Sequence, residues 1–114
     1  MADVRLSVQK VLQAGLTPVY TGSLTATTVD YVFKNNGRVF IHAKKAGAGD
    51  CTATVTTPVT VDGKAVADLA VTVVATTGDK MIGPLPPAIF NDGNGDARVM
   101  FSEITGLTVG IFEL

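Results

Sequence analysis

Short runs in which apolar residues alternate with small polar ones, most often threonine, dominate the sequence between residues 38 and 111. The clearest are residues 51–56, which read Cys-Thr-Ala-Thr-Val-Thr, and residues 70–74, which read Ala-Val-Thr-Val-Val. Alternation with a period of two, together with β-branched residues, is typical of strands that turn one face to a core and the other to water or a partner. The chain is therefore expected to be all-β.

Turn signals separate these runs at regular intervals. The longer loops at residues 46–50, 58–68 and 83–96 are rich in Gly, Pro, Asn and Asp, which accept the backbone angles of turns. About eight short strands with a turn roughly every 8 to 12 residues predict an antiparallel β-sandwich. Loops of this length suit connections that cross between sheets, so a jelly-roll-like arrangement is expected first. An immunoglobulin-like sandwich is the alternative, although the chain lacks Trp and a cysteine pair.

A Pro-rich block at residues 83–87 interrupts the second half of the chain. Each proline fixes φ and lacks an amide donor, so turn or polyproline-like geometry is expected there. Residues 88–90 are interpreted as a further short strand, and no segment predicts a convincing helix.

The beginning of the chain is less regular. Gly15 and Pro18 interrupt the one stretch that could form helical turns. Val4, Leu6 and Val8 alternate with polar residues, as in a short strand. These features predict an extended arm that includes one strand.

The tail of this arm, residues 21–28, contains mostly small polar residues and suits a loop or a peripheral strand. The expected organisation is a single domain in which residues 1–28 form the N-terminal arm and first strand. Residues 29–114 then form the β-sandwich.

The composition indicates a surface that meets a partner. Of the 114 residues, 46% are hydrophobic and 17% are charged, and the mean hydropathy is +0.36. Exposed apolar area usually marks an interaction site, so a partner is expected to cover part of this surface. Nine basic and ten acidic residues give a formal charge of −1, which provides no field to attract nucleic acid.

Targeting signals and reactive cysteines are also not expected. The first residues lack a basic segment followed by an apolar one, so no secretory signal is expected. The sequence contains no run of about 18 apolar residues, so no membrane-spanning helix is expected either. The product is therefore expected to be made, and kept or assembled, in a cytoplasm. Cys51 lies in a strand-like run and is interpreted as a small buried hydrophobe.

One loop has the ligand spacing of a calcium site. Asp92, Asn94, Asp96 and Glu103 occupy positions 1, 3, 5 and 12 of an EF-hand-like loop. Position 6, where the sharp turn requires glycine, is Ala97, and the flanking sequence is Pro-rich and strand-like rather than helical. The favoured interpretation is a polar loop that joins two strands, so no metal is assigned.

No catalytic constellation is evident. His42 is the single histidine, and general acid–base chemistry requires a positioned partner that no local residue supplies. The carboxylates are scattered, mostly over turns, and no Gly-rich loop has phosphate-binding form. The protein is therefore expected not to be an enzyme and to need no cofactor.

One hairpin combines basic and aromatic residues: Lys34, Arg38, Lys44 and Lys45, with Tyr31, Phe33 and Phe40. Such interleaving can stack on single-stranded nucleic acid. A solvated basic edge above core aromatics is the favoured interpretation, so no nucleic-acid partner is expected.

Three segments together carry a family resemblance: Asn-Asn-Gly-Arg-Val-Phe-Ile-His at 35–42, Val-Asp-Gly-Lys-Ala-Val-Ala-Asp at 61–68, and Ile-Gly-Pro-Leu-Pro-Pro-Ala-Ile-Phe-Asn at 82–91. With Gly-Leu-Thr-Pro at 15–18, they resemble small structural proteins of tailed bacteriophages, and suggest the capsid decoration (cement) family. The resemblance covers most of the chain. Its motifs are structural, so it implies no active site.

This resemblance implies a compact β-domain on the outside of the virion head, usually a trimer, bound between subunits of the major capsid protein. The protein would be made in the host cytoplasm and stabilise the shell from the capsid exterior. The arm would reach across a neighbouring subunit, with Val4, Leu6, Val8, Val11 and Leu12 as apolar anchors. Linking many weak sites on one shell would make attachment avid.

Two other kinds of protein remain as alternatives. A phage tail-tube subunit, head-tail connector or other virion subunit would also be β-rich and oligomeric. A carbohydrate-binding β-sandwich would present aromatic residues on one face, but the chain has only two Tyr, five Phe and no Trp.

Overall fold

The computed structural model describes residues 3–22 and 30–114. Eleven strands and one short helix form within this described part, in the order β1 (Asp3–Arg5), β2 (Val8–Lys10), β3 (Asp30–Lys34), β4 (Val39–Lys45), β5 (Cys51–Val55), β6 (Thr60–Val61), β7 (Lys64–Ala65), β8 (Leu69–Val73), β9 (Gly78–Ile82), α1 (Pro87–Phe90), β10 (Asp96–Phe101) and β11 (Leu107–Glu113). The all-β prediction is confirmed.

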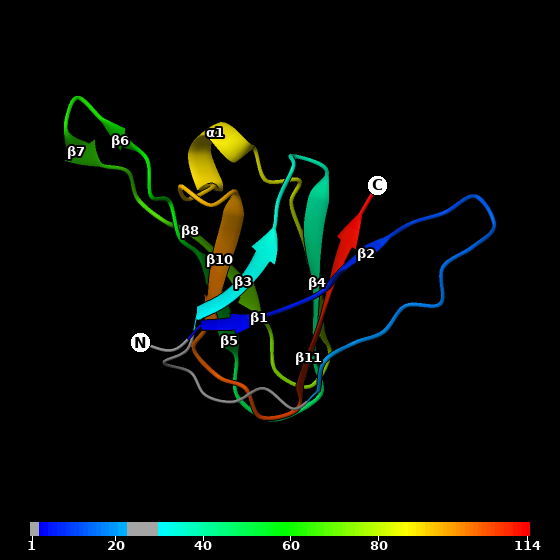
Figure 1. Cartoon of the computed structure of the whole chain (residues 1–114). Helices are drawn as coiled ribbons and strands as arrows, with labels where there is room; N and C mark the ends of the chain where they lie inside the picture. The colour runs from blue at the N-terminus through cyan, green and yellow to red at the C-terminus, as the bar shows by residue number, and fades with distance from the viewer. Residues whose placement is uncertain (1–2, 23–29) are drawn as a thin grey trace.

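The strands are arranged in two large sheets that face each other (Figure 1). Sheet A has the order β1-β3-β10-β5-β8, and sheet B has the order β2-β11-β4-β9. The β6–β7 hairpin forms a small sheet of its own and projects from the body of the molecule (Figure 1). Most neighbours are antiparallel, but β1 runs parallel to β3 and β2 runs parallel to β11. The predicted antiparallel sandwich is therefore corrected to a pair of mixed sheets.

The core lies between the two sheets and is built by the alternation that the sequence displays. In β5, Cys51, Ala53 and Val55 are fully buried, whereas Thr52 and Thr54 are half-buried on the outer face. β4 and β10 follow a similar rule and supply Val39, Ile41 and Val99, while edge strands and connecting segments add core residues such as Ile82 and Leu85. Burying a side chain of Val or Leu size stabilises the fold by about 1.5–3 kcal/mol.

The N-terminal segment joins both sheets. After β1 pairs with β3 in sheet A, Leu6 and Ser7 cross to the other sheet, where β2 pairs with β11. Leu6 is buried in the core between the sheets, with Val4 and Val8 packed partly buried beside it. A free arm is not confirmed for residues 3–10, because their alternating apolar residues find places in the core.

Two further details differ from the sequence-based expectations. The expected count of about eight strands is too low, because β1, β2 and the β6–β7 hairpin add short paired segments. The strand expected at residues 88–90 is instead part of α1, since Pro87 occupies an early helical position that needs no amide donor. Residues 23–28 of the tail of the arm, and Val29, where the β-sandwich is expected to begin, lie outside the described residues.

Candidate functional site

The outer face of sheet B carries a hollow beneath the loop of residues 11–20. Loop residues line one side of this hollow of about 290 Å³, and sheet residues line the other. The apolar lining residues are Val11, Leu12, Leu16 and Pro18 from the loop and Phe40, Met81 and Phe112 from the sheet. The loop thus lays apolar side chains over a sheet face that the strand alternation turns away from the core.

A second hollow of about 480 Å³ continues this surface. It is lined by Gly37, Arg38, Phe40, Met81, Gly83, Pro84 and Leu114. Phe40 and Met81 line both hollows, so the two form one continuous apolar surface, called here the sheet B outer face. Met81 is 68% exposed, Leu114 61% and Leu12 54%, so water meets large apolar side chains across this surface.

Tyr20 fastens the end of the loop to the sheet. Its ring lies edge-on to Phe112, with centroids 5.7 Å apart, and the Lys44 ammonium lies 4.5 Å from the ring centroid. The ring has room because residue 110 is glycine: a Cβ on Gly110 would lie 2.8 Å from the Phe112 ring and 3.1 Å from that of Tyr20. A cation above a tyrosine face adds about 0.5–1 kcal/mol at an exposed site.

A chain of hydrogen bonds connects Tyr20, His42 and Asp79. The Tyr20 hydroxyl lies 2.7 Å from Nδ1 of His42, and Nε2 of His42 lies 2.5 Å from Oδ1 of Asp79. One proton arrangement satisfies all three groups: Tyr20 donates to Nδ1, and Nε2–H donates to the carboxylate. Both ring nitrogens are therefore hydrogen-bonded, and the imidazole connects the end of the loop at Tyr20 to Asp79 of β9.

The sequence did not reveal these partners of His42. Tyr20 and Asp79 lie 22 and 37 residues away from it, and only the fold brings them together. Part of the signal was present, because the alternation of β4 placed Phe40, His42 and Lys44 on the face opposite the core.

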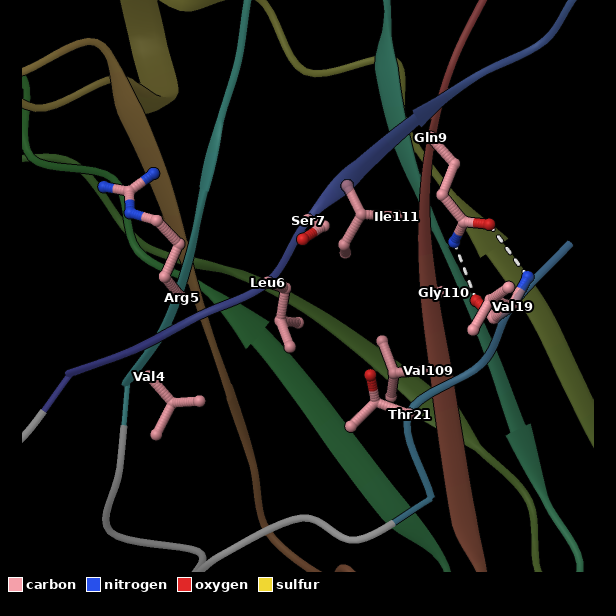
Figure 2. A pocket seen from close by; sticks show the side chains of 10 residues that line it. All are labelled: Val4, Arg5, Leu6, Ser7, Gln9, Val19, Thr21, Val109, Gly110 and Ile111. Atoms are coloured by element: carbon pink, nitrogen blue, oxygen red, sulfur yellow. Dashed lines mark hydrogen bonds between the residues drawn. The ribbon is translucent and has the colours of Figure 1, made fainter.

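A further pocket, of about 450 Å³, lies where the N-terminal segment crosses between the sheets. Figure 2 shows Leu6 and Val109 among its lining residues, with the Gln9 side chain extended toward Val19 at one border. The Gln9 amide donates to the Val19 carbonyl at 2.7 Å, and the Val19 amide donates to Gln9 Oε1 at 2.8 Å. Thr21 then pairs with Val109 through two backbone hydrogen bonds, so residues 19–21 border the pocket along the edge of β11.

The five expected arm anchors fall into two groups. Val4, Leu6 and Val8 face the core of their own chain, where they are buried or partly buried. Val11 and Leu12 are exposed and line the sheet B outer face. Only these last two are placed to contact a partner without unfolding.

The structure does not bring the four calcium candidates together, because Glu103 lies far from the other three. Asp92 accepts the amides of Asn94 and Asp96 through Oδ1, at 2.8 and 3.2 Å, and forms the tight polar loop that was favoured from the sequence. Glu103 lies beyond the other end of β10, roughly 20 Å along an extended strand, and accepts the Thr105 amide there at 2.9 Å. Residues 3–22 and 30–114 contain no cluster of three or more His, Cys, Asp or Glu side chains able to hold a metal.

Two arginines form ion pairs with the aspartates of this loop. Arg5 reaches Asp96 at 2.6 Å, and this hydrogen bond raises the pKa of Arg5. Arg98 contacts Asp92 at 3.4 Å and Asp30 at 3.3 Å. Burial alone would raise the pKa of Asp92, but the two amide hydrogen bonds and the charge of Arg98 bring it below its ordinary value.

The basic hairpin is dispersed in the structure. The Lys34 ammonium donates to the Asn94 carbonyl at 3.2 Å, and Lys44 lies over Tyr20. Lys45, expected at a solvated edge, is buried instead, because its ammonium donates to the carbonyls of Ala48 and Thr105. Phe33 and Tyr31 lie in the core, as the favoured interpretation predicted, and not on a stacking platform.

Cys51 is fully buried in the core, in agreement with its interpretation as a small hydrophobe. None of the helices among the described residues has the length and apolar character needed to cross a membrane. Comparison of the chain with protein-family models, with curated proteins and with solved structures finds no significant match.

Proposed function

We propose that the protein is a bacteriophage capsid decoration (cement) protein that binds the outside of the head and stabilises the shell of the major capsid protein. The observation that carries this proposal is the sheet B outer face, where exposed Met81, Leu114 and Leu12 surround two adjoining hollows. Contiguous exposed apolar surface of this kind is characteristic of protein–protein contacts. The family resemblance of the sequence supplies the identity of the partner.

The distribution of polar and apolar groups on this face also suits a binding surface. His42 is held between Tyr20 and Asp79, and the charged residues next to the hollows include Arg38 and Lys44. An apolar centre with a charged border is the usual composition of an interface, in which a few large side chains supply most of the affinity.

A jelly-roll-like sandwich with an attachment arm is the finer fold that we propose. Its support is that β3 and β4, β4 and β5, β8 and β9, and β10 and β11 each lie in different sheets, so successive strands repeatedly cross the core. The arm is assigned to residues 11–20, which carry Val11 and Leu12. Residues 3–10 anchor that loop, because β2 fixes its start and Gln9 fixes its end.

On the virion, each chain would occupy the capsid exterior as part of a trimer. A single site built from a few exposed apolar residues binds weakly, and joining three such sites raises the effective concentration of each. Assembly would follow synthesis in the host cytoplasm, without nucleic acid, membrane or cofactor.

Co-sedimentation with empty heads of the parent phage that lack this chain tests the proposal. Wild-type protein is expected to pellet with the heads and raise their melting temperature. Met81→Asp and Leu12→Asp should each weaken binding by about tenfold or more, since each buries a charge in an apolar contact. Val61→Asp is the matched control, because Val61 is 62% exposed on the projecting hairpin.

Three results would reject the decoration role. The first is a wild-type protein that fails to pellet with the heads, and the second is equal binding by Met81→Asp and Val61→Asp. The third is the formation of rings without heads, seen by electron microscopy, which favours a tail-tube or connector subunit. Specific retention on a glycan array would favour the carbohydrate-binding alternative.

A further inference from the structure

The β8 edge of sheet A lacks the features by which edge strands usually avoid pairing. β1 and β2 are three residues long, and β9 carries Asp79 and Lys80 within the strand. β8 has five residues, and the chain contains no charge and no proline from residue 69 to residue 78. Short length, charges and prolines are what keep exposed edges from recruiting another strand.

The direction of the backbone groups along β8 follows from its neighbours. Thr52 of β5 is bonded to Ser102 through both its amide and its carbonyl, so it faces β10. Successive residues of a strand point their backbone groups to opposite sides, so Ala53 faces β8, where its register partner is Val71. Ala70 and Thr72 therefore direct their N–H and C=O groups to the open side, where β8 has no strand neighbour in the described part.

We propose that this edge binds the same edge of a second copy, so that β8 pairs antiparallel with β8 of its partner about a two-fold axis at Val71. In this register Ala70 of each copy lies opposite Thr72 of the other, and the two pairs form four backbone hydrogen bonds. Val71 of one copy lies opposite Val71 of the other, and these two residues form no backbone hydrogen bonds with each other. The two A sheets become one continuous sheet.

The side chains of β8 are complementary to those of a second copy in this register. Leu69, Val71 and Val73 share the core-facing side, and the two-fold places Leu69 of one copy opposite Val73 of the other. Val73 is fully buried, but Leu69 is 37% exposed and Val71 is only half-buried, so pairing extends the core over the incompletely covered residues. Apolar and β-branched side chains that lie opposite each other stabilise strand pairing.

Charge does not oppose this register. Asp68 precedes β8, and the two-fold places it opposite Val74 of the other copy and far from the other Asp68. The Asp68 carboxylate also accepts the Thr57 amide of its own chain at 2.8 Å, which holds it beside the base of the β6–β7 hairpin. A second copy therefore meets a neutral edge along the whole of β8.

Single-cysteine cross-linking of the full chain tests the register. In a Cys51→Ala background, Val71→Cys should give a disulfide-linked dimer on mild oxidation, because residues opposite each other in such a position have Cα atoms about 4.5 Å apart. Thr72→Cys and Val61→Cys are the controls: the first faces Ala70 of the other copy, and the second lies on the hairpin. Cross-linking of the Val71→Cys variant no faster than that of the Val61→Cys variant would overturn the proposal.

Light scattering after size exclusion gives an independent reading. The wild-type mass should rise with concentration to twice that of the unpaired assembly, which is two chains of 11.8 kDa if the unpaired protein is a monomer and six if it is a trimer. Val71→Lys should halve this mass, while Val61→Lys leaves it unchanged. Thr72→Pro, which removes an outward donor, serves if Val71→Lys does not fold. A mass of one chain, or of three, at every concentration rejects the pairing. The sheet B outer face is untouched by these variants, so head binding and β8 pairing can fail separately.

Discussion

The side chain of Gln9 bonds the backbone of Val19 as a neighbouring strand would, donating to its carbonyl at 2.7 Å and accepting from its amide at 2.8 Å. A carboxamide can do both because it carries a donor and an acceptor side by side. The two bonds close the loop of residues 11–20 into a ring anchored on β2. Its exposed apolar residues are thereby presented in a fixed position.

Gln9→Ala is expected to free this loop without unfolding the sheets. Hydrogen exchange at the Val19 amide should become faster, and unfolding should require about 1 kcal/mol less free energy. Gln9→Glu should give part of the effect, because a carboxylate accepts from the amide but cannot donate to the carbonyl. Gln13→Ala, in the same loop, is the control, and equal exchange in all variants would contradict the role assigned to Gln9.

The buried lysine offers a second test. Lys45→Met preserves the length of the side chain but leaves the carbonyls of Ala48 and Thr105 without their donor, so the free energy of unfolding should fall by about 1–3 kcal/mol. Lys44→Met should cost less, because Lys44 is exposed above Tyr20. Urea unfolding followed by circular dichroism measures both, and equal losses would show that burial of Lys45 adds nothing.

Acid stability should depend on Asp92. Burial acts to raise its pKa, but two amides and Arg98 outweigh burial, so the pKa lies below its ordinary value in the folded chain. A carboxylate of this kind stabilises the fold above its unfolded pKa of about 4, and the contribution is lost as the pH falls through the lower, folded value. Asp92→Asn should therefore be less stable than wild type at pH 6, with a difference that shrinks below about pH 4.

Asp62→Asn is the control for this pH dependence. Asp62 lies in the hairpin turn at a φ of 54°, a conformation that Asn also accepts. Thermal unfolding from pH 2 to pH 7 should show no comparable convergence for this variant. A difference between Asp92→Asn and wild type that persists unchanged at pH 2 would contradict the lowered pKa.

The N-terminal segment should behave as part of the domain. Leu6→Ala is expected to lower the free energy of unfolding by about 2–4 kcal/mol, because Leu6 is buried between the sheets. Leu12→Ala, a matched change at an exposed residue, should alter it by less than about 0.5 kcal/mol while weakening attachment. Chemical denaturation distinguishes them, and a Leu6→Ala protein as stable as Leu12→Ala would restore the idea of a detachable arm.

Local pattern predicted much of this fold, and the failures share one cause. The alternation in β5 and β4 identified which residues enter the core, because burial of a strand residue depends on its face. Nothing local indicated that Lys45 would find two carbonyls or that His42 would meet Tyr20 and Asp79. These contacts join residues far apart in the chain. The parallel pairings of β1 with β3 and of β2 with β11 were missed for the same reason.

The sequence indicated the sheet B outer face only in part. Of the five expected anchors, Val11 and Leu12 are exposed on this face, whereas Val4, Leu6 and Val8 pack in or against the core. The exposure of Met81 and Leu114 was not predicted, because a lone apolar residue near the end of a strand resembles a core residue until the sheet order is known.

The pairing of β2 with β11 also sets a condition on biosynthesis. β2 leaves the ribosome roughly one hundred residues before β11, and at about 5–20 residues per second its partner arrives some 5 to 20 seconds later. Until then Leu6 has no completed core to enter. β2 therefore has no sheet partner during most of the synthesis of the chain, whereas β1 can pair with β3 much earlier.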